Sequence, residues 1–273
     1  MTEPKSHTVS PTVSVVIPVF NQVHWTERCL NSLLNHSEIA RDLIIIDNYS
    51  TDTTPEVLKR FAPEFEKQGW KFTVIRNEEN RGFGRACNQG IKIATGDYIT
   101  ILNNDTWHMP GWDTALARAI ETLDAGMVGP HYYEKEFNEQ KLLKRAIRFA
   151  RWNRGKHRRF WVPMMMFFRR SAFEKVGVFD ERYFVSFEEI DLRVRFDRAG
   201  LKFFMVGDCF IWHAVKGTRG HSHLIPSSHE LEGRKLFMEK WGFDPDDLRP
   251  GYFSWPERIK RRLQRIRNGL DLF

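Results

Sequence analysis

The first hundred residues alternate between short runs of buried-type side chains and stretches with the spacing of an amphipathic helix. Aliphatic and β-branched residues dominate four runs, which predict strands at residues 13–17, 43–46, 72–75 and 98–102. The stretches between them predict helices at residues 24–35, 54–68 and 83–94. Strands that alternate with helices of this length are typical of a parallel sheet with right-handed crossovers. The pattern therefore predicts an α/β fold, with a mostly parallel sheet flanked by helices.

The second half of the chain is less regular. Its apolar spacing predicts helices at residues 110–124, 141–151, 187–198, 228–240 and 256–267. Strands are predicted at residues 161–168, 203–206 and 209–212, and Ser171 is predicted to cap a short helix. There is no internal repeat and no low-complexity linker. We therefore expect one domain over residues 1–225, followed by a basic, helical C-terminal extension over residues 226–273.

Polar side chains follow each of the four N-terminal strands. Asn21 follows the first, Asp47 the second and Asn77 the third, and an Asn-Asn-Asp triplet at 103–105 follows the fourth. The carboxyl ends of parallel strands meet at one edge of a sheet, where ligands of open α/β folds bind. The sequence therefore predicts a ligand site at this edge. Neither GxGxxG after the first strand nor GxxxxGK[ST] is present, so the usual dinucleotide and P-loop fingerprints are excluded.

Composition and charge exclude several classes of protein. With 273 residues, 41% of them hydrophobic, the chain can bury a sizeable core and is not a disordered or collagen-like chain. Its three cysteines are far apart and show no CxxC spacing, which argues against a zinc knuckle or a disulfide framework and favours a reducing compartment. No apolar run approaches the roughly 20 residues that span a bilayer.

The net charge of +7 is concentrated in two segments. Residues 141–170 hold eleven basic and no acidic residues, and residues 251–273 hold six basic and two acidic ones. Without them, 25 basic and 33 acidic residues remain, so the body of the protein is acidic. The segments 141–159 and 256–267 have the composition of helices that dock on an anionic membrane surface. For the second segment, a helix packed on the acidic body and a protein-binding helix stay open as alternatives. The basic stretches contain no recognised nucleic-acid motif, so we expect no nucleic-acid partner.

Seven short motifs in this order and spacing resemble the family 2 glycosyltransferases, and most of all their rhamnosyltransferase-like branch. The motifs are VSVVIPVFN at 13–21, IDNYSTD at 46–52, NRGFGRACN at 80–88, GDYITILNND at 96–105, FDERYF at 179–184, EEIDL at 188–192 and WH at 212–213. The resemblance implies a Rossmann-like GT-A fold that binds a nucleotide-sugar donor, with a nucleotide-binding half at about 11–106 and an acceptor half at about 107–225.

The resemblance also implies which residues hold the donor. These are Pro18, Phe20, Asn21, Asp47, Asn80, Arg81, Gly82, Asn88, Asn103, Asn104, Lys216 and Arg219. For Asp47 a functional role is favoured, with an aspartate that begins an Asx-turn with Ser50 as the alternative, whereas Phe20 is equally a core residue. The Gly-rich segment that opens at Asn80 suits either an anion cradle at a helix N-terminus or a plain strand-to-helix turn.

A divalent metal, Mn²⁺ or Mg²⁺, is implied at the Asn103-Asn104-Asp105 triplet. The family's Asp-x-Asp supplies hard oxygen ligands that help to neutralise a diphosphate leaving group. Here Asn103 replaces the first carboxylate, so Asp105 and His213 are the implied metal ligands, and the missing charge is expected to weaken metal binding. The nearby His221-Ser222-His223 is interpreted as a solvated loop rather than a second metal site.

Inverting transfer needs a carboxylate that takes the proton of the acceptor hydroxyl. The EEIDL motif supplies three candidates at the start of a helix, where the helix dipole stabilises a charged carboxylate. Alignment with the family's Glu-Asp-x-Asp favours Glu189 as the base, followed by Asp191 and Glu188. We therefore predict an inverting glycosyltransferase that moves a sugar from a UDP- or dTDP-type donor to a glycan or lipid-linked acceptor.

The substitutions at Asn103 and Glu189 leave a second hypothesis, a catalytically silent GT-A protein that binds glycans or acts as a scaffold. A nucleotidyltransferase is disfavoured because the basic Gly-rich signature after the first strand is missing. The polar N-terminal segment lacks the apolar core of a signal peptide. We expect a cytoplasmic location, with peripheral attachment to the inner face of the cell membrane as a further hypothesis.

Overall fold

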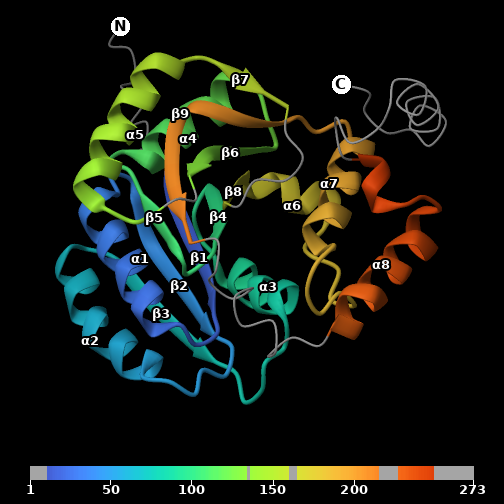
Figure 1. The fold of residues 1–273 in the computed structure, drawn as a ribbon, viewed down its shortest axis with the longest axis horizontal. Coiled ribbons are helices and arrows are strands. Elements are labelled where there is room, and N and C mark those ends of the chain that lie inside the picture. The colour runs from blue at the N-terminus through green and yellow to red at the C-terminus, as the bar shows by residue number, and fades with distance from the viewer. Residues whose placement is uncertain (1–10, 134–135, 160–164, 215–226, 249–273) are drawn as a thin grey trace, which may run out of the picture.

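A computed structural model of the chain describes residues 11–133, 136–159, 165–214 and 227–248. Its centre is a nine-stranded sheet with the order β3-β2-β1-β4-β8-β6-β9-β5, and β7 also pairs with β9 (Figure 1). The strands are β1 Val13–Val19, β2 Ala40–Asp47, β3 Lys71–Arg76, β4 Tyr98–Leu102, β5 Thr106–His108, β6 Met127–Tyr133, β7 His157–Arg158, β8 Met165–Arg169 and β9 Phe203–His213. The helices are α1 Val23–His36, α2 Thr54–Lys67, α3 Phe83–Ile93, α4 Trp112–Thr122, α5 Glu139–Asn153, α6 Arg170–Val176, α7 Glu188–Arg198 and α8 Ser227–Trp241, and a short 3₁₀ helix spans Pro245–Leu248.

The four N-terminal strands run parallel, as the sequence predicts. The second half extends this sheet through β8, which is antiparallel to both β4 and β6, while β6 and β9 are parallel. The register places Val19 beside Asp47 and Asp47 beside Arg76, so the carboxyl ends of three strands are level. This edge is where the predicted polar residues meet.

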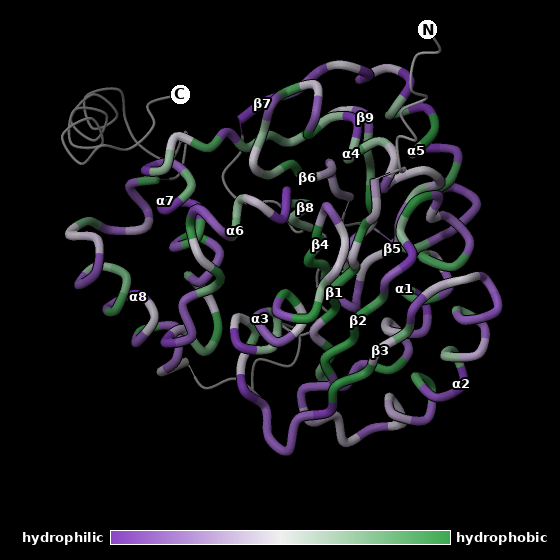
Figure 2. Tube along the Cα trace, turned by 180° about the vertical axis from the view of Figure 1, so that it is seen from behind, coloured by the Kyte–Doolittle hydropathy of each residue, from purple (hydrophilic) through white to green (hydrophobic). Residues whose placement is uncertain are grey.

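Alternation along the strands gives the sheet two apolar faces. Val15 and Ile45 belong to one hydrophobic cluster, and their neighbours Val16 and Ile44 belong to another on the opposite face. Helices α1, α2, α4 and α5 contribute to the first cluster, and α3, α6 and α7 contribute to the second. In Figure 2 the hydrophobic colour accordingly concentrates on the central strands, whereas the outer turns of the helices are hydrophilic.

A third, smaller hydrophobic cluster joins α7 to α8. It contains Tyr183 and Phe187 from the loop before α7, Val194 from α7, and Phe237 from α8. Phe237 is fully buried. Helix α8, which begins where we predicted the C-terminal extension, therefore shares a core with α7. The domain boundary at residue 225 stays a prediction.

Several details of the second half differ from the predictions. The two predicted strands at 203–206 and 209–212 form one strand, β9, whose pairing with β6 shifts register between Pro130 and His131. Gly207 lets the end of α5 pack directly on this strand, because a Cβ there would lie 2.2 Å from the Asn153 carbonyl oxygen. Ser171 is not a cap but lies inside α6, whose N-cap is Arg169. Strands β5, β6 and β7 were not predicted.

The first basic segment forms the predicted helix, α5. Leu142 and Ala146 are buried, and Phe149 packs against the same core, so this face of α5 covers the sheet. Ile147 and Trp152 are 56% and 72% exposed. Contact of this helix with a membrane stays a prediction, and the segment 256–267 lies outside the described residues. In the described part of the chain, no helix has both the length and the apolar character needed to cross a bilayer.

Candidate active site

Asp47 ends β2 at the level edge of the sheet and is fully buried. One carboxylate oxygen accepts a hydrogen bond from the Ser50 N–H at 2.8 Å, and the other pairs with the Arg76 guanidinium from β3. Arg76 also donates to the Ser50 carbonyl at 2.8 Å. The turn hydrogen bond to Ser50 that we kept as the alternative role of Asp47 is therefore present. Sequence reasoning missed Arg76, although a basic residue at the end of the third strand was a visible signal.

The loop after β1 is held against the loop after β2. The Asn21 side-chain oxygen accepts from the Thr51 N–H at 2.7 Å, and the Asn21 N–H donates to the Ser50 hydroxyl at 2.8 Å. Asn21 has a left-handed φ of 56°. Asn104 is buried and donates to the Thr26 hydroxyl at 2.8 Å and to the Asn21 carbonyl at 3.3 Å. Asn21 and Asn104 thus join three loops at the sheet edge.

A cluster of side-chain amides shapes the Gly-rich segment. Asn48 donates to the Asn80 side chain at 2.7 Å, and its oxygen accepts from the Arg81 N–H at 3.0 Å and from Asn77 at 2.9 Å. The Asn80 oxygen also accepts from the Gly82 N–H at 3.0 Å. The side chains of Asn48 and Asn80 therefore fix the backbone just before α3.

Asp105 and His213 are brought together by strand pairing. Thr106 in β5 lies opposite His213 in β9, and the Ala214 N–H donates to the Asp105 carbonyl at 3.0 Å. The His213 Nε2 atom lies 3.4 Å from Asp105 Oδ1, and both side chains are largely buried. A carboxylate oxygen and an imidazole nitrogen that converge in this way suit a divalent metal. Among the described residues, no group of three or more His, Cys, Asp or Glu side chains gathers around one point.

Glu188 and Glu189 begin α7, which approaches the sheet beside α3. Two consecutive non-glycine residues, Ser186 and Phe187, have left-handed φ values of 67° and 71° just before the helix. Glu188 is buried and Glu189 is half-buried. The pKa of the Cys87 thiol in α3 is raised, first by burial and then by the charge of Glu188, so α3 and this first turn are electrostatic neighbours.

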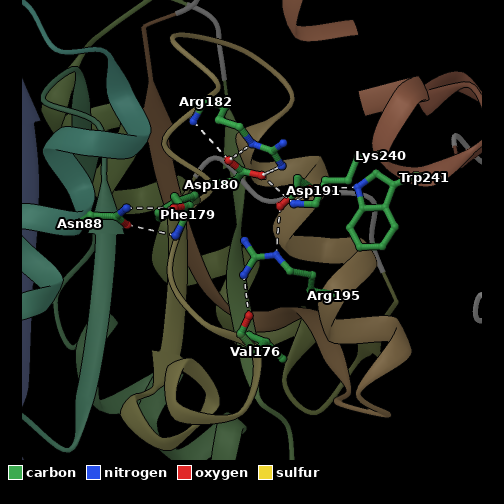
Figure 3. A network of polar contacts seen from close by, with 9 residues as sticks. All are labelled: Asn88, Val176, Phe179, Asp180, Arg182, Asp191, Arg195, Lys240 and Trp241. Carbon is green, nitrogen blue, oxygen red and sulfur yellow. Dashed lines mark hydrogen bonds and ion pairs between the residues drawn. The ribbon is translucent and has the colours of Figure 1, made fainter. Parts of the chain in front are cut away.

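Asn88 connects α3 to the loop that leads to α7. Its amide donates to the Phe179 carbonyl at 2.9 Å and accepts from the Phe179 N–H at 3.0 Å (Figure 3). It also donates to the Glu181 carboxylate at 3.0 Å. The predicted role of Asn88 in donor binding stays a prediction, whereas its bonds in the structure hold the loop.

Asp191, the second candidate base, is fully buried and its carboxylate is engaged on both oxygens. Arg195 donates to Oδ2 at 2.9 Å. Lys240 and Trp241 approach Oδ1 at 2.7 and 2.9 Å (Figure 3). A carboxylate held by two cations and an indole N–H inside the protein is poorly placed to take a proton from an acceptor. This arrangement favours Glu189 over Asp191.

The other predicted donor-binding residues lie around the same edge or outside the described part. Pro18 lies in β1, Phe20 and Asn103 are half-buried in the loops after β1 and β4, and Arg81 is exposed. Gly82, with a φ of 83°, lies directly before α3. Lys216, Arg219 and the histidines at 221 and 223 lie outside the described residues.

Comparison with known proteins decides the family. The model for "Glycosyl transferase family 2" matches residues 14–177, which is more than half of the chain. The chain belongs to this family. One relative, the putative glycosyltransferase EpsH of Bacillus subtilis (strain 168), is 32% identical over 109 residues, which cover 40% of this chain and 30% of EpsH. The chain spans about half or less of the length of the curated relatives it matches.

Solved structures share the fold of this family 2 member. The mannosyltransferase PcManGT from Pyrobaculum calidifontis, in complex with GDP-Man and Mn²⁺, is 21% identical with a TM-score of 0.61 and covers 85% of this chain and 65% of its own. GalNAc-T7 with UDP, GalNAc and Mn²⁺ is 17% identical with a TM-score of 0.67, over 96% and 55% of the two chains. The predicted GT-A fold is thereby confirmed. The rhamnosyltransferase-like branch and the individual site residues stay predictions.

Proposed function

We propose that this chain is an inverting glycosyltransferase that moves a sugar from a nucleoside-diphosphate sugar to a hydroxyl of a glycan or lipid-linked acceptor. The observation that carries the choice of base in this proposal is the engagement of Asp191. With that carboxylate fully buried against Lys240, Trp241 and Arg195, and Glu188 buried, the half-buried Glu189 is the favoured base on the first turn of α7. The nucleotide is of the UDP or dTDP type, and the protein works in the cytoplasm.

The sheet edge supplies the donor site. The buried Asp47 holds the partly exposed Arg76 guanidinium at this edge, where Arg76 would offer donors to the nucleotide base, and the loop of Asn21 lies beside them. Asp105 and His213 would hold a divalent metal, and diphosphate oxygens would complete its coordination. When bound, the metal would neutralise charge on the departing diphosphate.

Transfer then follows a single displacement. Glu189 takes the proton of the acceptor hydroxyl, and that oxygen forms a bond to the anomeric carbon. The bond between this carbon and the diphosphate oxygen breaks on the opposite face, and its electron pair leaves with the nucleoside diphosphate. Attack opposite to the leaving group inverts the configuration at the anomeric carbon.

The variant Glu189→Gln tests this assignment. We expect turnover to fall by about 100-fold or more, because general base catalysis contributes 10²–10⁴. Donor affinity should stay within about twofold, because the amide keeps the size of the side chain. The measurement is release of nucleoside diphosphate from UDP-glucose, dTDP-rhamnose and GDP-mannose with Mn²⁺ and with EDTA, together with UDP affinity by calorimetry.

The exposed Glu174→Gln in α6 is the matched control and should retain activity. Near-normal turnover of Glu189→Gln would contradict the assignment of the base. Donor binding by the unaltered protein without release from any of the three donors would instead favour the catalytically silent alternative. Turnover that persists in EDTA would remove the metal from the proposal.

A further inference from the structure

The C-terminal end of α8 contacts α7, the helix whose first turn carries the three candidate carboxylates, through buried charged side chains (Figure 3). Asp191, in the first turn of α7, is fully buried. Its Oδ1 atom is approached at 2.7 Å by Lys240 Nζ and accepts a hydrogen bond of 2.9 Å from Trp241 Nε1. Both come from the last two residues of α8, some 50 positions along the chain. Two bonds to one buried oxygen fix the first turn of α7 more closely than apolar packing alone would.

Lys240 also binds the loop that leads into α7. Its Nζ donates to Asp180 at 2.7 Å, and Asp180 accepts two bonds from Arg182 at 2.9 and 2.6 Å. Arg182, and Lys240 after it, hold the pKa of Asp180 well below its usual range. The preceding residue, Phe179, is bound by Asn88 of α3. A single ammonium group therefore links α8 to both sides of the turn that presents Glu188 and Glu189.

A second contact lies directly at the start of α7. Gly233 in α8 packs so closely on Phe187 that a Cβ there would lie 2.9 Å from the Phe187 ring. Phe187 is buried and has the left-handed φ of 71°. Its carbonyl oxygen accepts a hydrogen bond of 2.8 Å from the Asp191 N–H, in the first turn of α7. Left-handed non-glycine residues persist only where their surroundings hold them. Helix α8 provides such surroundings.

We propose that Lys240 and Trp241 are positioning residues that hold the first turn of α7 in the geometry that presents Glu189 to the acceptor. The proposal rests on the proposed function, in which Glu189 is the base. Asp191 lies two residues after Glu189, so a shift of its backbone carries Glu189 with it. A displacement of about 1 Å at a reacting group can cost about 100-fold in rate. In this role both residues act through Asp191 rather than on the reacting atoms, and both lie outside the region matched by the family model.

The decisive variants change the bonds to Asp191 with little change in shape. Lys240→Met removes the ammonium group and keeps an unbranched stem, and Trp241→Phe removes the indole N–H and keeps an aromatic ring. Lys240→Arg restores the positive charge. Lys235→Met is the matched control, because Lys235 lies on the same helix with its side chain 79% exposed and 3.8 Å from Glu239.

We expect kcat for nucleoside diphosphate release to fall about 10- to 100-fold in Lys240→Met and about 3- to 10-fold in Trp241→Phe. The donor KM and the affinity for UDP with Mn²⁺ should stay within about twofold, and Lys240→Arg should recover most of kcat. Hydrogen exchange of the amides of residues 186–191 should speed up in Lys240→Met but not in Lys235→Met. A purely structural role would lower kcat and UDP affinity together.

Three results would overturn the proposal: equal kcat in Lys240→Met and Lys235→Met, a parallel loss of UDP affinity, or unchanged exchange at residues 186–191. If Lys240→Met does not fold, Trp241→Phe provides the same comparison, because it removes a single hydrogen bond. Absence of turnover in the unaltered protein contradicts the proposed function instead. In that event the exchange measurement alone decides whether α8 holds the first turn of α7.

Discussion

Gly82 shows how one residue joins the predicted donor-binding segment before α3 to the loop that leads into α7. It has a φ of 83° and a ψ of 168°, a region that only glycine adopts readily. A Cβ at this position would lie 2.3 Å from the Phe184 carbonyl oxygen, and the next residue, Phe83, donates its N–H to that same oxygen at 3.1 Å. The Gly-rich segment therefore lets the loop before α7 approach the start of α3. This close approach was part of neither sequence interpretation, the anion cradle or the plain strand-to-helix turn.

Replacing Gly82 with alanine should destabilise the protein by about 2–4 kcal/mol, because backbone strain and a clash with backbone atoms add together. Gly69→Ala is the matched control: Gly69 has a φ of 78°, but nothing lies within 4 Å of its added Cβ. That variant should lose about 1 kcal/mol from strain alone. Urea unfolding of both variants measures the difference, and equal losses would show that the approach of Phe184 costs nothing.

At the level of single residues, sequence patterns predicted the candidates, and only the family resemblance ranked them. Asp47 is predictable because it follows a buried strand, and parallel register brings the strand ends together. The engagement of Asp191 is not predictable in this way, because its partners Lys240 and Trp241 lie about 50 residues away. Without the family resemblance, the local pattern of three acidic residues in one helical turn does not distinguish them, because their surroundings depend on the elements that pack on that turn.

At the level of elements, the sequence predicted the strands whose own residues carry a hydrophobic run. Strands β1 to β4 fall within a few residues of their predicted positions. Strands β5 and β7 are three and two residues long and exist because they pair with β9, while β6 contains Gly129 and Pro130. Their formation depends on long-range pairing rather than on local propensity. The second half of the sheet was therefore harder to predict than the first.

Asp113 also shows that local structure can depend on a residue far away in the sequence. Asp113 lies in the first turn of α4 and is fully buried. Its carboxylate accepts hydrogen bonds from the backbone N–H groups of Glu38, Ile39 and Ala40 at 2.9, 2.8 and 2.7 Å. It thereby fixes the connection between α1 and β2, although those residues lie more than 70 positions away.

Asp113→Asn should cost about 2–4 kcal/mol of unfolding free energy, since an amide removes the charge and turns an N–H₂ group toward backbone donors. Asp124→Asn is the control with the same chemical change. Its side chain is 89% exposed, and its left-handed φ of 46° suits asparagine. That variant should change stability by less than about 0.5 kcal/mol. Guanidinium unfolding tests both variants. A loss of unfolding free energy below about 1 kcal/mol in Asp113→Asn would show that Asp113 does not fix the connection between α1 and β2.

At the scale of the whole molecule, the surplus of positive charge is partly explained by α5. This helix covers the sheet with Leu142 and Ala146 and carries its basic residues on the remaining faces. A helix packed on the body of the protein was our alternative only for residues 256–267. The structure shows that arrangement for α5, in the first basic segment. The charge pattern identified a helix but did not show what it covers, because the apolar stripe is the same whether it meets a sheet or a lipid surface.

Global stability should fall as the pH drops below 6.5, because the protein buries a neutral histidine. His108 is fully buried, and burial lowers its pKa to about 3. The unfolded chain binds a proton at this histidine near pH 6.5, whereas the folded chain binds it only near pH 3. The free energy of unfolding therefore falls by about 1.4 kcal/mol per pH unit between 6.5 and about 3. His131, whose pKa burial lowers to about 4, acts in the same direction. The lowered pKa values of Asp97 and Asp180 matter only near pH 4 and below.

Denaturant unfolding at pH 7 and pH 5 measures the combined effect of the two histidines, and comparison with a His108 variant isolates the contribution of His108. Between these values His108 alone should account for about 2 kcal/mol of lost stability. His108→Gln should reduce that loss, because glutamine does not titrate and can still hydrogen-bond Ser32 and Thr106, which contact the ring at 3.0 and 3.3 Å. His24→Gln, at an exposed position in α1, should leave the pH dependence unchanged. An equal loss in His108→Gln and the unaltered protein would mean that the acid sensitivity arises elsewhere, since no other change in the variant alters proton uptake.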